Sequence, residues 1–467
     1  MTSLKSTILS GSVYLALRQF AGILITVGGS FFLSRVIGAQ NLGIYGTAAA
    51  FELYLYVVAS IGISPYLIRL PENISKNQLH TGFTILFFSS LLCILFSFII
   101  SPVISVFTHL PILKIVIPVM VCVLPLSFFN EVSFSIIQRN LNFKQIAIAE
   151  LLAQLAYYAG AIPCALLKFG FWAPVIGWWS HEIMLVIFGI CSTKYLPRFN
   201  FDIPEMIKMI KYGSAYAFSN ASGMLCSIAA PLLITTFVGP KATGYYTLSF
   251  RIVESLGFIR EVTRKMSLGV IAEYNRQNKD ISSVVKRGMQ LQLISIAIPL
   301  ICFGMIAPWF IPFVIGYEWL PVLQIYPFIS IYFCAISVFQ LHIAVLNVLG
   351  KNLETALFNL LLATIIIGSS VFFLNFTMSV RGYGYALLCG LPSLFLINYF
   401  YTRYKSKLSF TLIFFWGLCC AIALCGIIYS PMLYFALFVP LLFKKSRVAL
   451  AGNIKIVISM IHKRTIT

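Results

Sequence analysis

Acidic side chains are scarce in this sequence. Only 13 of its 467 residues are Asp or Glu, and all charged residues together make up 10% of the chain. Hydrophobic residues make up 60%. A water-soluble domain of this length could not bury so much apolar surface. The composition therefore excludes a soluble protein and indicates one whose solvent is lipid.

Motifs that carry enzyme chemistry are lacking too. The chain contains no P-loop, no HExxH pair and no DxD in a loop, so it is not expected to hydrolyse ATP or to be a zinc hydrolase. Its 11 cysteines include no CxxC pair and lie inside apolar segments, where cysteine acts as a small hydrophobic residue. We expect no disulfide, no metal and no cofactor. The loops are short and leave no room for a catalytic domain, so the chain is predicted not to be an enzyme.

Long apolar runs separated by short polar breaks fill the chain instead. A membrane-spanning helix needs roughly 20 apolar residues. The sequence predicts fourteen such spans, at 8–34, 42–68, 81–107, 113–137, 146–168, 170–192, 207–237, 242–268, 288–316, 319–348, 355–376, 382–402, 409–428 and 430–443. The first run is too long for a cleavable signal peptide. The expected fold class is an all-α polytopic membrane protein.

The basic residues indicate how these spans are oriented. There are 33 Lys and Arg against 13 acids, a net charge of +20, and basic residues concentrate in cytoplasmic loops. With the N-terminus in the cytoplasm, the outer side receives only Arg35, Lys114, Lys168, Lys241 and Arg381. Both termini are therefore predicted to be cytoplasmic. The positive charge is interpreted as a topology signal, and no nucleic-acid partner is expected.

One motif occurs twice in polar breaks. The segment "SRVIGAQNLGIYG" covers 34–46 and "TTFVGPKATGYYT" covers 235–247. Gly38, Gly43 and Tyr45 fall on Gly239, Gly244 and Tyr246 at a shift of 201. Six spans lie between the copies, so the repeated segments share one orientation. This predicts two six-helix halves related by a pseudo-twofold axis along the membrane normal, plus a C-terminal helix pair.

The repeat sets the expected domain boundaries. A linker joins the halves and carries the start of an interfacial helix, "IPEMIKMIKYG" at 203–213. A basic tail is expected on the inner membrane surface. The predicted segments are 1–192, 193–206, 207–402, 403–443 and 444–467.

The order of motifs resembles a known family. "GSVYLALRQF" opens the first span, the 34–46 motif follows, and "QRNLNFKQIAIAE" stands at 138–150. This order is similar to that of the polysaccharide-transport branch of the multidrug/oligosaccharidyl-lipid/polysaccharide exporter superfamily. The resemblance implies a bacterial inner-membrane flippase. Such a protein moves polyprenyl-pyrophosphate-linked oligosaccharides outward by alternating access for O-antigen or exopolysaccharide synthesis. It also implies association with polysaccharide polymerase machinery.

Two other functions stay open. A drug or small-metabolite exporter of the same superfamily would typically have twelve spans and an acidic, aromatic cavity. A membrane polymerase or glycosyltransferase would need a sizeable outer loop with catalytic side chains.

Four charged residues fall near the middle of predicted spans: Arg18, Glu52, Arg251 and Glu254. A charge at mid-bilayer costs roughly 2.5–3.5 kcal/mol, so such residues are candidates for function. Arg18 and Arg251 are predicted to bind the pyrophosphate, because guanidinium binds phosphate bidentately. Glu52 and Glu254 would hold these arginines or carry a coupling ion, H⁺ or Na⁺. The alternative is two buried ion pairs, Arg18–Glu52 and Arg251–Glu254, that only fix packing.

Other charges receive weaker interpretations. Arg260, Arg264 and Lys265 would attract an anionic headgroup at a cytoplasmic entrance, or face anionic lipid as an orientation signal. His181 and Glu182 are interpreted as structural. Glu131 and Glu150 are expected to pair with basic residues near the inner membrane surface.

Overall fold

The computed structural model describes residues 2–69, 74–140, 142–260, 263, 271, 274, 281–405, 408–444 and 446–447, with side chains from Gly22 onward except at 69, 143, 215 and 216. Every regular element within these ranges is a helix. The predicted all-α class is confirmed for this part of the chain.

The chain forms two compact units. Unit 1 comprises Met1–Leu248 and Val371–Val380, and unit 2 comprises Ser249–Ser370 and Arg381–Thr467. The helix α9 (Pro240–Leu256) begins in unit 1 and ends in unit 2. The predicted division into halves at 193–206 stays a prediction.

Unit 1 begins with α1 (Thr2–Ala59), in which two helices meet at one break. The break is Gly38, whose φ of 77° and ψ of 165° are not helical. Two separate spans were expected at 8–34 and 42–68, joined by a polar break at 35–41. The structure reduces this break to Gly38, because glycine adopts positive φ without steric cost and lets helical residues continue on both sides.

Five further helices and a short one complete the body of unit 1. They are α2 (Ile63–Arg69), α3 (Lys76–Phe107), α4 (Leu113–Val121), α5 (Leu124–Arg139), α6 (Phe143–Leu166) and α7 (Trp172–Thr193). Helix α6 packs against α7 and α1, and α5 packs against α7. Helix α4 packs against α3 and α1, and most of its residues are buried, so it also belongs to the interior of this unit.

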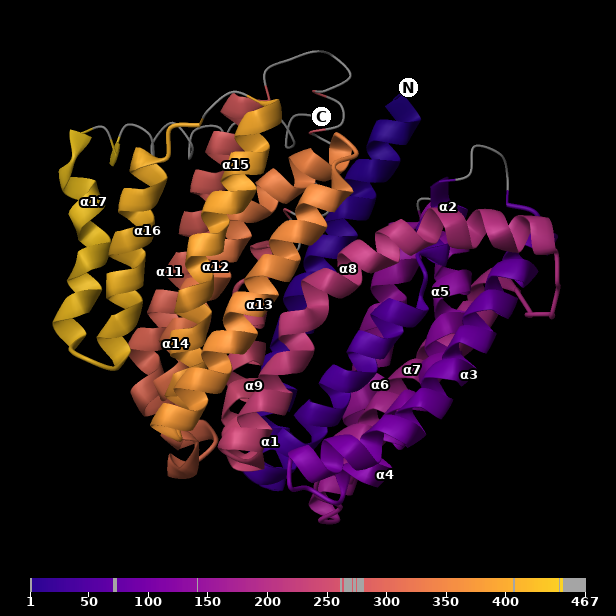
Figure 1. Ribbon diagram of the computed structural model, residues 1–467, viewed down its shortest axis with the longest axis horizontal. Coiled ribbons are helices and arrows are strands. Elements are labelled where there is room, and N and C mark those ends of the chain that lie inside the picture. The colour runs from indigo at the N-terminus through magenta and orange to yellow at the C-terminus, as the bar shows by residue number, and fades with distance from the viewer. Residues whose placement is uncertain are drawn as a thin grey trace. The chain divides into compact units, whose positions relative to one another are not determined.

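The helix α8 (Ile203–Phe237) starts where the linker helix was expected. Its first turns lie across the ends of unit-1 helices before it turns to run beside α1 (Figure 1). The Asp202 carboxylate caps the helix by accepting from the Glu205 amide at 3.2 Å. The Glu205 carboxylate accepts from the Tyr66 hydroxyl and the Gln78 side chain, both at 3.1 Å. These bonds fix the start of α8 to α2 and α3.

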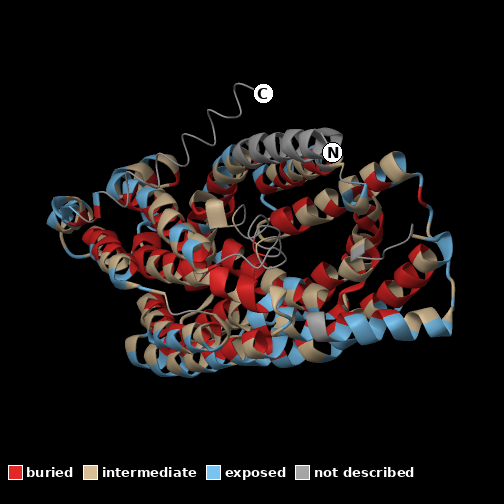
Figure 2. Ribbon diagram, turned by 90° about the horizontal axis from the view of Figure 1, so that it is seen from above, coloured by how far each residue is buried: buried red, intermediate tan, exposed pale blue. Residues whose placement is uncertain are grey.

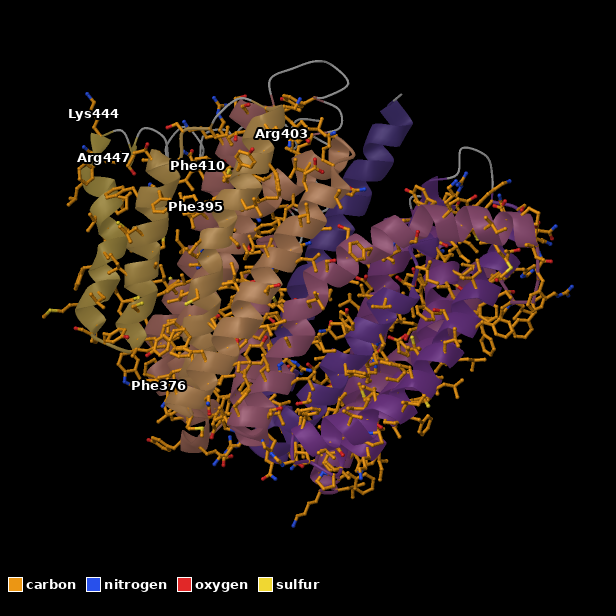
Figure 3. All side chains as sticks on the ribbon, in the orientation of Figure 1. Phe376, Phe395, Arg403, Phe410, Lys444 and Arg447 are labelled. Carbon is orange, nitrogen blue, oxygen red and sulfur yellow. The ribbon has the colours of Figure 1, made fainter. Side chains whose placement is uncertain are left out.

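Unit 2 contains the remaining helices. They are the end of α9, then α11 (Ser282–Val314), η1 (Tyr317–Trp319), α12 (Val322–Val348), α13 (Asn352–Thr377), α14 (Val380–Gly390), η2 (Leu391–Ser393), α15 (Leu394–Tyr404), α16 (Thr411–Leu424), η3 (Cys425–Ile427), η4 (Pro431–Phe438) and α17 (Val439–Leu442). The end of α13 from Val371 and the first residue of α14 belong to unit 1. The basic side chains of Arg403, Lys444 and Arg447 lie at the same end of this unit (Figure 3). The sequence assigned that end to the cytoplasm.

Both units have an apolar outer surface of the kind that faces lipid. Large hydrophobic side chains are exposed, such as Ile99 of α3 at 72% and Phe313 of α11 at 85%. In Figure 2 buried residues occupy the sides on which helices meet, and exposed ones lie on outward sides. Since water would disfavour such a surface, it fits a hydrocarbon environment.

Ten described helices are long and apolar enough to cross a membrane, and two shorter apolar stretches cover Thr411–Ile427 and Pro431–Leu442. Gly22–Ala59 counts as one of the ten although two spans were expected there, and α9 has only 17 residues. The chain is a multi-pass helical membrane protein. The number of fourteen spans and the pseudo-twofold relation of the halves stay predictions.

Candidate functional site

The two copies of the repeated motif touch each other inside unit 1. A Cβ added to Gly43 of α1 would lie 1.8 Å from the Pro240 carbonyl oxygen, and one added to Gly244 of α9 would lie 1.9 Å from the Ala39 carbonyl oxygen. Each glycine therefore meets the backbone of the other copy. We call residues 38–47 with 235–247 the glycine crossing.

The glycine crossing is reciprocal. Ala39 and Pro240 occupy the same position in the two copies, as do Gly43 and Gly244. Gly43 of the first copy touches Pro240 of the second, and Gly244 of the second copy touches Ala39 of the first. Such exchanged contacts are the pattern of a local twofold contact. Both copies also kink at a glycine with positive φ, Gly38 at 77° and Gly239 at 107°. Close backbone approach explains why the motif repeats its glycines.

A chain of threonine hydroxyls lies in the same contact. The Thr47 hydroxyl lies 2.9 Å from that of Thr235, which lies 2.7 Å from that of Thr243. All three residues are almost completely buried. A hydrogen-bonded chain in an apolar interior resists separation, because parting it leaves unpaired hydroxyls. The crossing is thus closed by both shape and hydrogen bonding.

A second feature of unit 1 is a group of three acids, which we call the acidic cluster: Glu52 of α1 and Glu182 of α7, which are buried, and Glu131 of α5, which is half-buried. Glu52 is 3% exposed and Glu182 is 5% exposed. The two carboxyl groups interact electrostatically, and the Trp178 indole lies beside Glu52. The mid-membrane position predicted for Glu52 thus coincides with a buried location shared with another acid.

Hydrogen bonds hold Glu182 in place. Asn130 Nδ2 donates to Glu182 Oε2 at 2.9 Å, and His181 Nδ1 lies 3.0 Å from Oε1. The His181 ring stacks on Trp178 with centroids 4.9 Å apart. His181 and Glu182 were interpreted as structural, and their bonds fit that interpretation. What the sequence missed is that the Glu182 carboxyl group interacts electrostatically with that of Glu52.

The expected surface pairing of Glu131 is wrong. Glu131 binds the Tyr56 hydroxyl and the Ser64 backbone, and its Oε2 is buried with no hydrogen-bond partner. It lies eight residues before Arg139, the last residue of α5, a rise of about 12 Å into the membrane. Arg139 itself donates to the Leu67 carbonyl at 3.1 Å. Counting residues back from that arginine could have revealed the depth of Glu131.

The candidate residues of the second half lie in unit 2, on or just after α9. Arg251 is half-buried, whereas Glu254 is exposed. Glu254 therefore differs from Glu52 in its environment, although both follow a copy of the motif. The Arg260 Nε donates to Gln340 Oε1 at 3.2 Å, and the guanidinium lies 4.9 Å from the centre of the Phe333 ring.

Three candidates cannot be placed. Arg264 and Lys265 lie outside the described residues, and so does the side chain of Arg18. Among the described residues no group of three or more His, Cys, Asp or Glu has a geometry that could hold a metal ion.

Comparison with known families and proteins gives consistent matches. The sequence model of a family described as polysaccharide biosynthesis protein matches residues 32–324, more than half of the chain. The succinoglycan biosynthesis transport protein ExoT of Rhizobium meliloti (strain 1021) is 18% identical over 219 residues, 47% of this chain and 44% of that protein. The teichuronic acid biosynthesis protein TuaB of Bacillus subtilis (strain 168) is 20% identical over 346 residues, 71% and 70% of the two chains. The match thus spans less than half of the first relative.

Solved structures share the fold. The lipid II flippase MurJ, in an inward closed conformation, superimposes with a TM-score of 0.72 at 14% identity, over 98% of this chain and 99% of that one. An inward-facing multidrug resistance MATE family transporter gives a TM-score of 0.57 at 14% identity, over 84% and 94%. At such identities the similarity establishes the architecture only.

Proposed function

The chain belongs to the polysaccharide biosynthesis protein family, and on this premise we propose that it is a flippase for lipid-linked oligosaccharides. It would carry polyprenyl-pyrophosphate-linked repeat units from the cytoplasmic to the outer leaflet by alternating access. The observation that carries the proposal is the family match, supported by a fold shared with a lipid II flippase over 98% of the chain. The exposed apolar helices supply the membrane embedding that such transport needs.

Arg18 and Arg251 are the proposed partners of the pyrophosphate. Guanidinium keeps its charge and presents a fork of donors that matches phosphate oxygens. Arg260, with Arg264 and Lys265, is proposed to attract the anionic headgroup from the cytoplasmic side. Glu52 and Glu254 are proposed to steady the arginines or to carry the coupling ion, H⁺ or Na⁺. Their different burial favours Glu52 for the coupling role, because a buried acid is costly to keep without a purpose.

The proposed location is the bacterial inner membrane, with both termini in the cytoplasm. Association with polysaccharide polymerase machinery would deliver the flipped repeat unit to the next enzyme.

Deletion of the gene tests the function directly. We expect loss of a surface polysaccharide and accumulation of its lipid-linked repeat unit, measured by mass spectrometry of lipid extracts. The repeat unit should resist a membrane-impermeant glycosidase in spheroplasts and become sensitive once the full chain is restored. A deletion strain that keeps the polysaccharide and accumulates no lipid-linked sugar would remove the proposal.

Cysteine labelling tests the topology. Starting from a variant without native cysteines, a membrane-impermeant maleimide should label Lys241→Cys and Arg381→Cys in intact cells. It should label Lys405→Cys only after lysis, because that residue lies on the basic side. Labelling of Lys405→Cys in intact cells would reverse the predicted orientation.

A further inference from the structure

We propose that Glu150 of α6 faces Arg18 of α1, forms an ion pair with it, and competes with the pyrophosphate for its guanidinium. The pairing is inferred from the register of the two helices and does not depend on transport. The competition rests on the transport function proposed above, because that proposal assigns the pyrophosphate to Arg18. The sequence gave Glu150 only an unspecified basic partner near the inner membrane surface.

Polar groups join α1 and α6 along one line, which we call the polar seam: Gly22, Thr26 and Ser30 of α1 with Gln154 and Tyr158 of α6. Gln154 Nε2 donates to the Gly22 carbonyl oxygen at 2.8 Å and also to the Thr26 hydroxyl. The Tyr158 hydroxyl donates to the Thr26 carbonyl oxygen at 3.1 Å and lies 3.3 Å from the Ser30 hydroxyl. These bonds fix how far the two helices are shifted relative to each other.

The polar seam has a regular register. Each of its α6 residues meets two α1 residues one turn apart, at sequence separations of 132 and 128. Both separations recur from Gln154 to Tyr158, so α1 and α6 run parallel and in step. One turn before Gln154 stands Glu150, and the same two separations place Arg18 and Gly22 opposite it. Both helices continue through these positions.

Other basic residues on α6 and on its neighbours α5 and α7 are worse placed to meet Glu150. On α6 the positions three and four residues away, where side chains share a face, carry no Lys or Arg. Lys144 lies six residues before Glu150, about 120° around the helix. Helix α7 contains no Lys or Arg, and Arg139 at the end of α5 donates to the Leu67 carbonyl at 3.1 Å. The register therefore assigns Arg18 to Glu150.

The alternative pair Arg18–Glu52 is less well matched in depth. No acid precedes Glu52 in the sequence, so Arg18 has no acidic partner on its own side of the Gly38 break. Glu52 stands 14 residues after Gly38, whereas Arg18 stands 20 residues before it. Even if the two segments fold back along each other, the levels differ by six residues, about 9 Å of helix. Glu150 stands at the level of Arg18.

The position of Glu150 also explains why it would hold the arginine only loosely. Glu150 is half-buried two turns into α6, where a carboxylate without a cation is costly. A carboxylate and a pyrophosphate accept hydrogen bonds from the same guanidinium donors, so they compete for Arg18. The more highly charged pyrophosphate would displace the carboxylate, and Glu150 would regain the guanidinium when the headgroup leaves. Glu150 is thus a positioning residue that keeps binding weak enough for release.

Cross-linking tests the register without requiring transport. In the full-length protein without native cysteines, a short bifunctional methanethiosulfonate should link Arg18→Cys to Glu150→Cys. It should do so as completely as it links Thr26→Cys to Gln154→Cys, two positions whose side chains are hydrogen-bonded. The matched control joins Arg18→Cys with Lys144→Cys, on another side of α6, and this link should be lost. Faster linking of Arg18→Cys to Glu52→Cys than to Glu150→Cys would overturn the pairing.

Thermal unfolding of the purified full-length protein tests the ion pair itself. Glu150→Gln should lower the unfolding temperature, because it leaves a guanidinium unpaired. Adding Arg18→Gln should recover most of that loss, since the two residues act as a unit. Equal and additive losses in the two single variants and the double variant would contradict the pair.

Binding of undecaprenyl pyrophosphate in detergent tests the competition. Glu150→Gln should bind this probe about tenfold more tightly than the wild type, the effect of removing one like charge roughly 10 Å away at an effective dielectric constant of about 20. Glu150→Asp keeps the charge and should bind close to the wild-type affinity. The matched control is Glu318→Gln, since Glu318 is exposed in η1, and it should leave the affinity unchanged.

The two proposals fail in different ways. A folded Glu150→Gln variant whose affinity is unchanged or weaker would overturn the competition, because a pair that only fixes packing changes stability alone. If Arg18→Ala binds undecaprenyl pyrophosphate as tightly as the wild type, the substrate role of Arg18 is wrong. The cross-link and the recovery of stability in the double variant would still support the pairing in that case.

Discussion

Replacing Gly43 or Gly244 with alanine should reduce polysaccharide export by about fivefold or more while leaving normal amounts of protein in the membrane. A Cβ at either position would lie within 2 Å of a backbone carbonyl oxygen of the other copy, and backbone cannot move aside as a side chain can. Relieving such a contact costs about 1–3 kcal/mol, which shifts a two-state equilibrium by about five- to 150-fold. If transport alternates between a state with the glycine crossing closed and one with it open, both variants should favour the open state.

The double variant Gly43→Ala, Gly244→Ala sharpens this prediction. Either change alone forces the same two segments apart, so the second should add little to the first, and the effects should be clearly non-additive. Gly28→Ala is the matched control in α1, because a Cβ there meets nothing within 4 Å. It should export at the wild-type rate. Additive losses in the double variant would mean that the two glycines act at separate places.

Cross-linking reports the state of the glycine crossing independently of export. The Thr47 and Thr235 hydroxyl oxygens are 2.9 Å apart, so Thr47→Cys with Thr235→Cys should form a disulfide in a background without the 11 native cysteines. The cross-link should stop export, and reduction should restore it. Adding Gly43→Ala should slow disulfide formation. Full export with the disulfide in place would show that the crossing need not open.

The sequence predicted most of the helices because the length and hydropathy of its apolar runs indicate spanning helices directly. Apolar runs such as 81–107 and 319–348 have the length and hydropathy of spanning helices, and α3 and α12 follow them closely. Boundaries differ where backbone geometry overrides polarity. The polar break expected at 35–41 reduces to Gly38, because one glycine with positive φ is enough to join two helices and redirect the chain.

The candidate site was predicted only in part. The depth of a residue within its predicted span can be estimated from the sequence, but the sequence does not show which residues of different helices lie close together. Glu52 was selected from its depth, and it is buried as a candidate should be. Its neighbours Glu131 and Glu182 come from helices 79 and 130 residues away along the chain, and no local pattern shows that these helices meet. The repeated motif, unlike the acids, did contain a sign that its two copies are in contact. Gly43 and Gly244 match because two backbones approach closely there, whereas Gly38 and Gly239 match because both have positive φ.

The arginines carry the other large effect that we expect. Changing Arg18 and Arg251 to alanine should abolish surface polysaccharide, with lipid-linked repeat units accumulating inside and the protein still inserted in the membrane. A pyrophosphate that leaves water loses its hydration, and only cationic donors of comparable strength replace it. Removing both guanidinium groups therefore leaves the headgroup without a partner in the membrane interior. Arg35→Ala is the matched control, because Arg35 is exposed near the Gly38 break of α1.

Arginine-to-lysine variants separate binding from packing. Lysine keeps the positive charge but offers a point charge instead of a planar fork, so Arg18→Lys and Arg251→Lys should each export at a reduced but measurable rate. If the arginines only neutralise acids inside the protein, Arg18→Ala would leave the buried Glu52 carboxylate unpaired and lower stability by about 3–5 kcal/mol. Arg251→Ala would lower it by less, because Glu254 is exposed. The matching Glu→Gln change would then restore both stability and export. If they bind the substrate, Glu52→Gln or Glu254→Gln restores stability at most, and export stays absent because the headgroup still has no partner. Restored export in Arg251→Ala, Glu254→Gln would therefore exclude Arg251 from the binding site, and the same holds for Arg18 with Glu52.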